Sequence, residues 1–123
     1  MLSVHDSVFS GNTTFPAEGG SVIRGEYGTV TLNNVTAFNN IGSAFVRNHA
    51  DINVNNSTIV NNDEAFDLSG SGSGITTIKN TTISGNDKGI INSGTLHLSN
   101  TIIANSTTTD CENTGTISTN TFS

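Results

Sequence analysis

A short motif occurs five times in this chain, and the repeat limits the fold more than any other feature of the sequence. Each copy begins with an aliphatic residue and carries Asn or Asp two positions later, and the copies start at Val4, Leu32, Val54, Ile78 and Leu98. The spacing inside the motif is constant, whereas the segments between copies differ in length. Constant units joined by variable spacers are typical of solenoid proteins.

The pattern inside each copy predicts short strands that alternate with tight bends. Apolar and polar residues alternate in segments such as 30–32 and 52–54, and a period of two is typical of a half-buried strand. The Asn residues that follow favour a bend, because Asn tolerates a left-handed backbone. Two further strands are expected in each coil, for example at 57–59 and 64–68.

Stacked coils of this kind predict an all-β fold: a right-handed, single-stranded parallel β-helix (β-solenoid) of about five coils with three short strands each. Neighbouring strands would lie about 4.8 Å apart, so equivalent residues should form inward columns. We expect three apolar columns, namely Val4, Leu32, Val54, Ile78 and Leu98; Phe9, Ala37, Ile59, Ile83 and Ile103; and Ile23, Phe45, Phe66 and Ile90.

A further column at the first bend is expected to contain Asn34, Asn56, Asn80 and Asn100. Their amides could hydrogen-bond from coil to coil as a structural ladder, as stacked Asn side chains do in other parallel assemblies. The alternative is an ordinary preference of Asn for turns, repeated by duplication. Both interpretations support the same fold.

We treat residues 1–123 as a single β-helix domain. The spacer Thr13–Gly28 and the Ser/Gly segment 69–74 are expected to form loops. A capping helix is not evident at either end, and solenoids need caps. We therefore expect a fragment of a longer solenoid, or a chain that associates end to end through open strand edges.

Composition restricts the partners. Four Lys and Arg against ten Asp and Glu give a net charge of −6, which argues against nucleic acid and against an anionic membrane surface. A membrane span of about 20 apolar residues is not evident. The single cysteine, Cys111, permits no internal disulfide and no multi-cysteine zinc site. Any export signal would have to lie outside this chain.

Several segments resemble the last repeats of bacterial right-handed β-helix proteins, which are large surface or secreted proteins related to polymorphic outer membrane proteins and similar predicted adhesins. The segments are Leu96–Asn105, the following Asp110-Cys111 pair, Asn80–Asn86 and Ile91–Leu96. The resemblance runs from Leu2 to Cys111 and implies the pectate-lyase-like superfold and an extracellular or cell-surface parent. It supplies no catalytic residue, and the family's anchor region is missing from this chain.

Asp63 and Asp87 are the best candidates for ligand binding, because they occupy equivalent positions in neighbouring repeats. They are also weak candidates for a metal site, in which calcium would be the cofactor. Glu64 and Lys88 would stack beside them as an opposite-charge pair. The plainer alternative is a solvated turn with one cross-coil ion pair, which contributes little to stability.

Arg24 and Arg47 fall at matching offsets and could bind a sugar or carboxylate, although the sequence favours the plainer interpretation of surface arginines packed on apolar neighbours. Acidic neighbours should raise the pKa of Cys111, which argues against a nucleophile. We assign no catalytic residue.

Three outward residues, Thr36, Thr58 and Thr82, could match an ice lattice, although strand propensity alone also places Thr outward.

The leading hypothesis is a non-enzymatic cell-surface or secreted β-helix module, a scaffold of the adhesin or passenger type that contacts glycans or host proteins. The alternative is a polysaccharide-active enzyme of the pectate-lyase-like class, either a lyase or a glycoside hydrolase. Ice binding is a remote third hypothesis.

Overall fold

The computed structural model describes residues 1–15, 21–70 and 74–119. In these residues the chain forms fourteen strands and no helix. The two loops predicted at 13–28 and 69–74 fall partly on residues 16–20 and 71–73, which lie outside the described residues. The strands are β1 (Leu2–Ser10), β2 (Ile23–Gly25), β3 (Thr29–Phe38), β4 (Ala44–Asn48), β5 (Asp51–Asn55), β6 (Thr58–Val60), β7 (Glu64–Leu68), β8 (Ile75–Lys79), β9 (Thr82–Ser84), β10 (Lys88–Asn92), β11 (Thr95–Ser99), β12 (Ile102–Ala104), β13 (Thr109–Asn113) and β14 (Thr116–Thr119).

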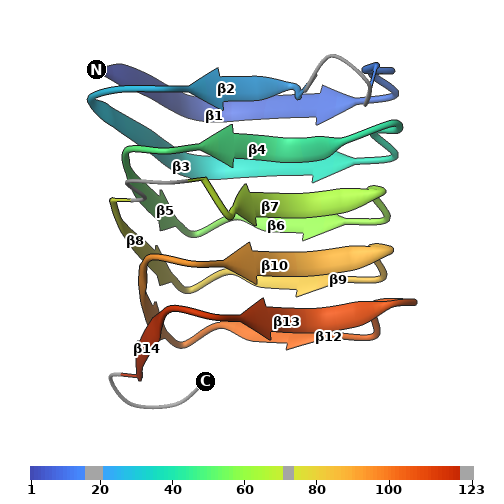
Figure 1. The fold of residues 1–123 in the computed structure, drawn as a ribbon. Coiled ribbons are helices and arrows are strands. Elements are labelled where there is room, and N and C mark those ends of the chain that lie inside the picture. The colour runs from blue at the N-terminus through green and yellow to red at the C-terminus, as the bar shows by residue number, and fades with distance from the viewer. Residues whose placement is uncertain (16–20, 71–73, 120–123) are drawn as a thin grey trace.

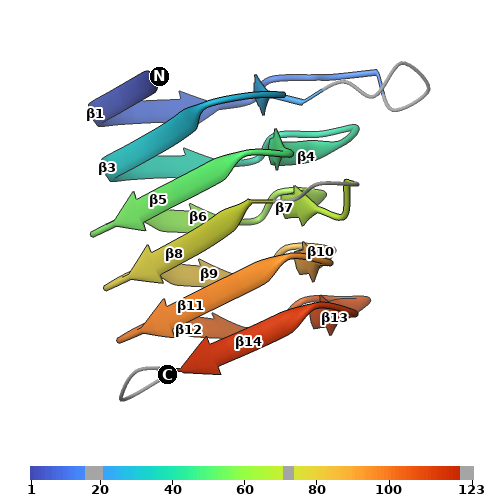
Figure 2. The same ribbon diagram turned by 60° about the vertical axis from the view of Figure 1, so that its left-hand side comes forward.

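These strands wind into a right-handed parallel solenoid of about four turns, slightly fewer than the predicted five (Figure 1). The turns stack strands at five levels, which we call coils. A five-stranded sheet has the order β13-β10-β7-β4-β2, with one strand from each coil. A nine-stranded sheet contains the other strands, because β1 and β3 bend and each supplies the first and second strand of its coil. Figure 2 shows β5, β8, β11 and β14 stacked in front of β6, β9 and β12. The predicted all-β parallel β-helix is confirmed.

Two columns of residues with positive φ make the bends. At the first bend, φ lies between 48° and 57° at Asp6, Asn34, Asn56, Asn80 and Asn100. At the second bend, φ lies between 55° and 65° at Gly11, Asn39, Asn61, Gly85 and Asn105. This left-handed conformation is costly for most side chains but accessible to Gly, Asn and Asp. The high Asn content is therefore a direct consequence of two sharp bends in every coil.

The strand register confirms two of the three predicted columns. Val4, Leu32, Val54, Ile78 and Leu98 pair in sequence along the first strands. Phe9, Ala37, Ile59, Ile83 and Ile103 do so along the second strands. Most of these side chains have no exposed surface. The axial core is thus a stack of matching aliphatic layers.

The third predicted column was wrong at one position. The register joins Ile23 to Val46, Val46 to Phe66, Phe66 to Ile90, and Ile90 to Cys111. Val46 therefore occupies the place predicted for Phe45, which is one residue out of step. Both residues are fully buried, as is Ala44 before them, and β7 buries four consecutive residues. The third strands thus depart from strict alternation of buried and exposed residues.

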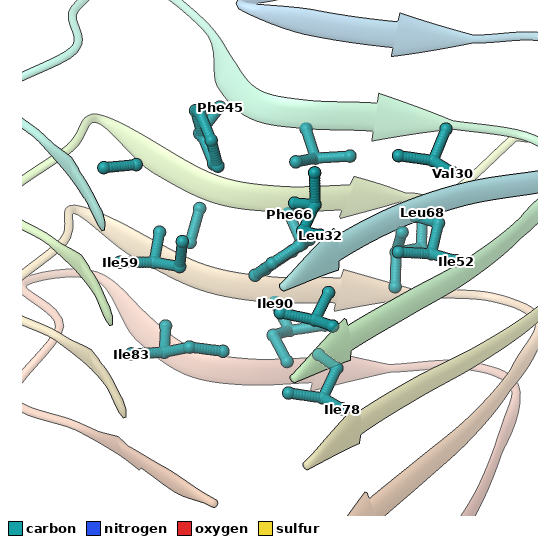
Figure 3. Close-up of a cluster of buried hydrophobic side chains, with 14 of the residues drawn as sticks. Val30, Leu32, Phe45, Ile52, Ile59, Phe66, Leu68, Ile78, Ile83 and Ile90 are labelled. Carbon is teal, nitrogen blue, oxygen red and sulfur yellow. The ribbon is translucent and has the colours of Figure 1, made fainter. Parts of the chain in front are cut away.

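The core is a cluster of buried apolar side chains that runs through the stacked coils, with Phe45, Phe66 and Ile83 among its members (Figure 3). The rings of Phe45 and Phe9 lie 5.5 Å apart in a tilted contact. Ala65 follows Phe45 one coil later, and Gly89 follows Ala65. A Cβ added to Gly89 would lie 3.1 Å from the Ile103 side chain and 2.2 Å from the Asp110 carbonyl oxygen. The small residues thus make room for bulky side chains and for close backbone packing.

Candidate functional site

A buried ladder of asparagine amides holds the coils together beside the second bend. Asn12 Nδ2 donates to Asn40 Oδ1 at 2.8 Å, Asn40 Nδ2 to Asn62 Oδ1 at 2.8 Å, and Asn62 Nδ2 to Asn86 Oδ1 at 3.1 Å. Asn40, Asn62 and Asn86 are at most 3% exposed. Ser106 occupies the equivalent position in the last coil. The N–H of Thr107, the residue after it, donates to the Asn86 carbonyl, just as the N–H of Asp87 donates to the Asn62 carbonyl one coil earlier. A satisfied buried network of this kind fixes the geometry of the surface above it.

The ladder expected at the first bend is present but exposed and incomplete. Asn100 donates to Asn80 at 3.1 Å, and Asn80 donates to Asn56 at 3.2 Å. The next step differs, because Asn56 Nδ2 lies 3.5 Å from Asn33 Oδ1 instead of reaching Asn34. Asn34 donates to the carboxylate of Asp6 at 2.6 Å. Water competes for these exposed amides, so they contribute less to stability than the buried ladder.

A depression of about 280 Å³ lies where three coils enter the five-stranded sheet. It is lined by Gly42, Ser43, Arg47, Asp63, Glu64, Asp87 and Lys88. Glu64 and Lys88 are the first residues of β7 and β10, and they pair in register. Asp63 and Asp87 precede them directly. The structure therefore brings together three of the predicted binding residues, Asp63, Asp87 and Arg47, with both members of the predicted charge pair.

The carboxylates of Asp63 and Asp87 bond to different neighbours. Asp63 Oδ2 accepts from the N–H of Gly42 in the preceding coil at 2.7 Å. Asp87 Oδ1 accepts from the hydroxyl of Thr108 in the following coil at 2.6 Å. Their nearest hydrogen bonds thus run in opposite directions along the axis. In the part of the chain that the structure describes, no three His, Cys, Asp or Glu side chains are grouped to hold a metal ion.

Glu64 and Lys88 differ from the other charged side chains that line this depression, Asp63, Asp87 and Arg47, each of which forms a hydrogen bond. Among the described residues, neither side chain makes a hydrogen bond or an ion pair within 4.0 Å. Burial raises the pKa of Glu64, the Asp67 carboxylate raises it further, and the Lys88 ammonium acts in the opposite direction. The predicted opposite-charge pair is therefore stacked in register without direct contact. It leaves one acceptor group and one donor group available to a ligand.

Arg47 is held by an acidic residue that the sequence interpretation missed. Its Nε donates to Asp67 Oδ2 at 2.7 Å, and its Nη2 forms an ion pair with the same oxygen. Burial acts to raise the pKa of Asp67, but hydrogen bonds from Ser69 and Arg47 outweigh it and hold the pKa below its ordinary range. The register pairs Arg47 with Asp67 on adjacent third strands. The equal offset of these two residues in their repeats could have revealed the pair.

Arg24 lies outside the depression. It pairs in register with Arg47, as the equal offsets predicted. Its Nη2 forms an ion pair with Glu26 at 2.8 Å, and both side chains are about half exposed. Arg24 and Arg47 therefore each have a carboxylate partner from the chain itself. A sugar or carboxylate ligand that bound both arginines would have to compete with these ion pairs.

Cys111 lies at the end of the third apolar column, next to Ile90. It is partly buried and packs against the core. Burial raises the pKa of its thiol, and the neighbouring Asp110 carboxylate adds to this effect. The direction agrees with the prediction, although burial is the larger cause. A thiol with a raised pKa is a poor nucleophile at neutral pH.

The register places Thr36, Thr58 and Thr82 in one outward rank of the second strands. Val8 and Ile102 continue the rank at its two ends and are 67% and 60% exposed. The threonine rank is thus three residues long.

Among the described residues there is no helix with the length and hydropathy of a membrane span.

Comparison of the chain with protein-family models, with curated proteins and with solved structures gave no match. The fold is shown by the structure itself. The resemblance to bacterial surface β-helix proteins stays a prediction.

Proposed function

We propose that this chain is a non-enzymatic binding module of a surface or secreted β-helix protein, and that the depression on the five-stranded sheet contacts its ligand. The observation that carries the proposal is that Glu64 and Lys88 make no hydrogen bond or ion pair, although they lie on a frame held by the buried Asn ladder. A rigid frame lowers the entropy lost when a ligand binds. The resemblance to bacterial surface proteins supports an extracellular or cell-surface location.

A glycan is the ligand class that fits this depression best. Sugar hydroxyls both donate and accept hydrogen bonds, and the depression offers an ammonium donor beside carboxylate acceptors. The second oxygens of Asp63 and Asp87 add acceptors, since each carboxylate uses only one oxygen in its recorded bond. A surface of a host protein with its own hydroxyl and amide groups is the alternative partner.

The test is a glycan array probed with the chain, followed by calorimetric titration of any glycan that binds. Glu64→Gln and Lys88→Ala should each weaken binding at least tenfold, because each removes one charged contact, which is worth about 1.5–3 kcal/mol. Lys79→Ala is the matched control, since Lys79 is an exposed lysine on β8 in the other sheet. Equal affinity of all three variants would exclude the depression as the binding site.

One observation favours a second candidate, a polysaccharide-active enzyme. Burial raises the pKa of Glu64, and a carboxyl group with a raised pKa suits general acid catalysis. Turnover of an acidic polysaccharide, measured with and without added calcium, would support this candidate if Glu64→Gln, Asp63→Ala or Asp87→Ala abolished it. Absence of turnover would remove the candidate.

A further inference from the structure

The outward face of the second strands is free of charged residues over all five coils. We call it the second-strand face. Its first rank consists of Val8, Thr36, Thr58, Thr82 and Ile102, and its second rank of Ser10, Phe38, Val60, Ser84 and Ala104. Both ranks point outward, because the column between them, from Phe9 to Ile103, faces the core. Five of the ten side chains carry a hydroxyl and five are apolar.

The distribution of charge selects the partner. The chain carries a net charge of −6, and none of its ten acidic residues stands in the second-strand face. An anionic polymer would be repelled by the field of the whole chain, and this face offers no cation to hold it. A cationic partner would instead be drawn to the carboxylates elsewhere. The face is therefore suited to an uncharged partner.

The chemistry of the face matches that of a neutral sugar chain. The hydroxyls of Thr36, Thr58 and Thr82 repeat at the coil spacing, about 4.8 Å. The partly exposed Phe38 and Val60 lie beside them and offer apolar surface to the C–H faces of sugar rings. The exposed Asn ladder borders the first rank and adds neutral donors and acceptors. Apolar contact and polar contact thus alternate over a short distance.

The size of the face argues against a protein partner. Five coils span about 19 Å along the axis, and the strand between the two bends spans about 17 Å. The resulting area of about 300 Å² is well below the roughly 800 Å² that each partner buries in a standard protein interface. A second copy of this chain would not be held by so small a flat patch. A few linked sugar units would cover it.

We infer that the second-strand face binds a linear, uncharged polysaccharide, a ligand class more specific than the glycan binding proposed above. The inference rests on the proposed function of a binding module but uses a different surface. The Asn ladders at both edges hold the ranks in place, so binding requires little ordering of the protein. The interrupted threonine rank favours this ligand over ice, which would need a regular lattice of identical groups.

The test is retention of the chain by microcrystalline cellulose and by chitin, with polygalacturonate as the anionic probe and adsorption to ice as a separate assay. Thr58→Asp adds a charge to the exposed centre of the face and should weaken retention at least tenfold. Thr77→Asp is the matched control, because Thr77 faces outward on β8 in a different part of the sheet. Circular dichroism should show that both variants keep the fold.

The inference requires retention by cellulose or chitin that Thr58→Asp weakens, and any other outcome overturns it. It falls if neither cellulose nor chitin retains the chain, if polygalacturonate or ice is bound in their place, or if Thr58→Asp binds as the unchanged chain does. Lys88→Ala separates the two proposals. If Lys88→Ala abolishes glycan binding and Thr58→Asp does not, the depression is the site, and the proposed function stands while this inference fails.

Discussion

Removal of the amide of Asn62 tests whether the buried ladder stabilises the fold. Asn62 Oδ1 accepts from the Asn40 N–H at 3.1 Å and from Asn40 Nδ2 at 2.8 Å. Asn62 Nδ2 lies within hydrogen-bond distance of the Ala37 and Val60 carbonyls and of Asn86 Oδ1. Asn62→Ala would remove all of these bonds at a position that is 3% exposed.

The size of the effect follows from what is left behind. Each hydrogen bond contributes about 1 kcal/mol net, and a buried donor left without a partner costs about 1–3 kcal/mol. The Asn40 N–H would lose its acceptor in Asn62→Ala. The lost bonds overlap, because two hydrogens on Nδ2 serve three acceptors, so they do not add fully. We expect the free energy of unfolding to fall by about 3–5 kcal/mol.

Asn80→Ala is the matched control. Asn80 also belongs to an asparagine ladder and has a φ of 51°, but it is exposed. Water can replace its bonds, so the loss should be about 1 kcal/mol, the cost of placing Ala in a left-handed conformation. Urea unfolding followed by far-ultraviolet circular dichroism measures both variants. If Asn62→Ala costs no more than Asn80→Ala, the buried ladder is not a principal source of stability.

Four further variants can be tested by the same unfolding measurement. Ser106→Asn should raise the free energy of unfolding by about 1 kcal/mol, because the hydroxyl of Ser106 is buried without a partner and a new amide oxygen could accept from Asn86. Gly89→Ala should lower it by about 2 kcal/mol or more, since the added methyl would lie 2.2 Å from a backbone oxygen. Gly11→Ala, which has a positive φ but open space, should cost only about 1 kcal/mol. Because the pKa of Asp67 is lowered in the folded chain, its carboxylate adds to the free energy of unfolding at pH values above the ordinary titration range of Asp. This stabilisation is lost as the pH falls through the lowered pKa. Asp67→Asn should therefore reduce stability at neutral pH by about 2 kcal/mol and reduce the loss seen on acidification; an unchanged acid response would contradict this reasoning.

The repeat was sufficient to predict the fold and two core columns, because each copy of the motif contains both bends at fixed distances from the first and second strands. The third strand lies beyond the motif, after a spacer of variable length, so its register could not be fixed in the same way. Two consecutive inward residues, Phe45 and Val46, then removed the alternation on which the assignment depended. The resulting error was a single residue, and Val46 took the place of Phe45.

The candidate site, like the core, was predicted only in part from the sequence. Equal offsets in neighbouring repeats correctly brought Asp63, Asp87, Glu64 and Lys88 to one place. The direction of each side chain could not be predicted, because hydrogen bonds to non-equivalent groups decide it. The sequence also did not indicate which of the two Asn columns would be buried. Asn recurs at both bends, and the two columns differ only in their burial. Sequence thus predicted which residues would be neighbours, but not which of them would be in contact.

The resemblance to surface β-helix proteins is carried by residues that make the fold. In the segment Asn80–Asn86, Asn80 and Gly85 have positive φ, Ile83 is in the core, and Asn86 ends the buried ladder. Only Thr82 and Ser84 of this segment point outward on the second strand. A solenoid can keep its bend and core residues while its outward residues vary, because the outward positions are not needed for stacking. A likeness based on the motif therefore supports a fold, whereas the ligand depends on the outward ranks and on the depression between coils.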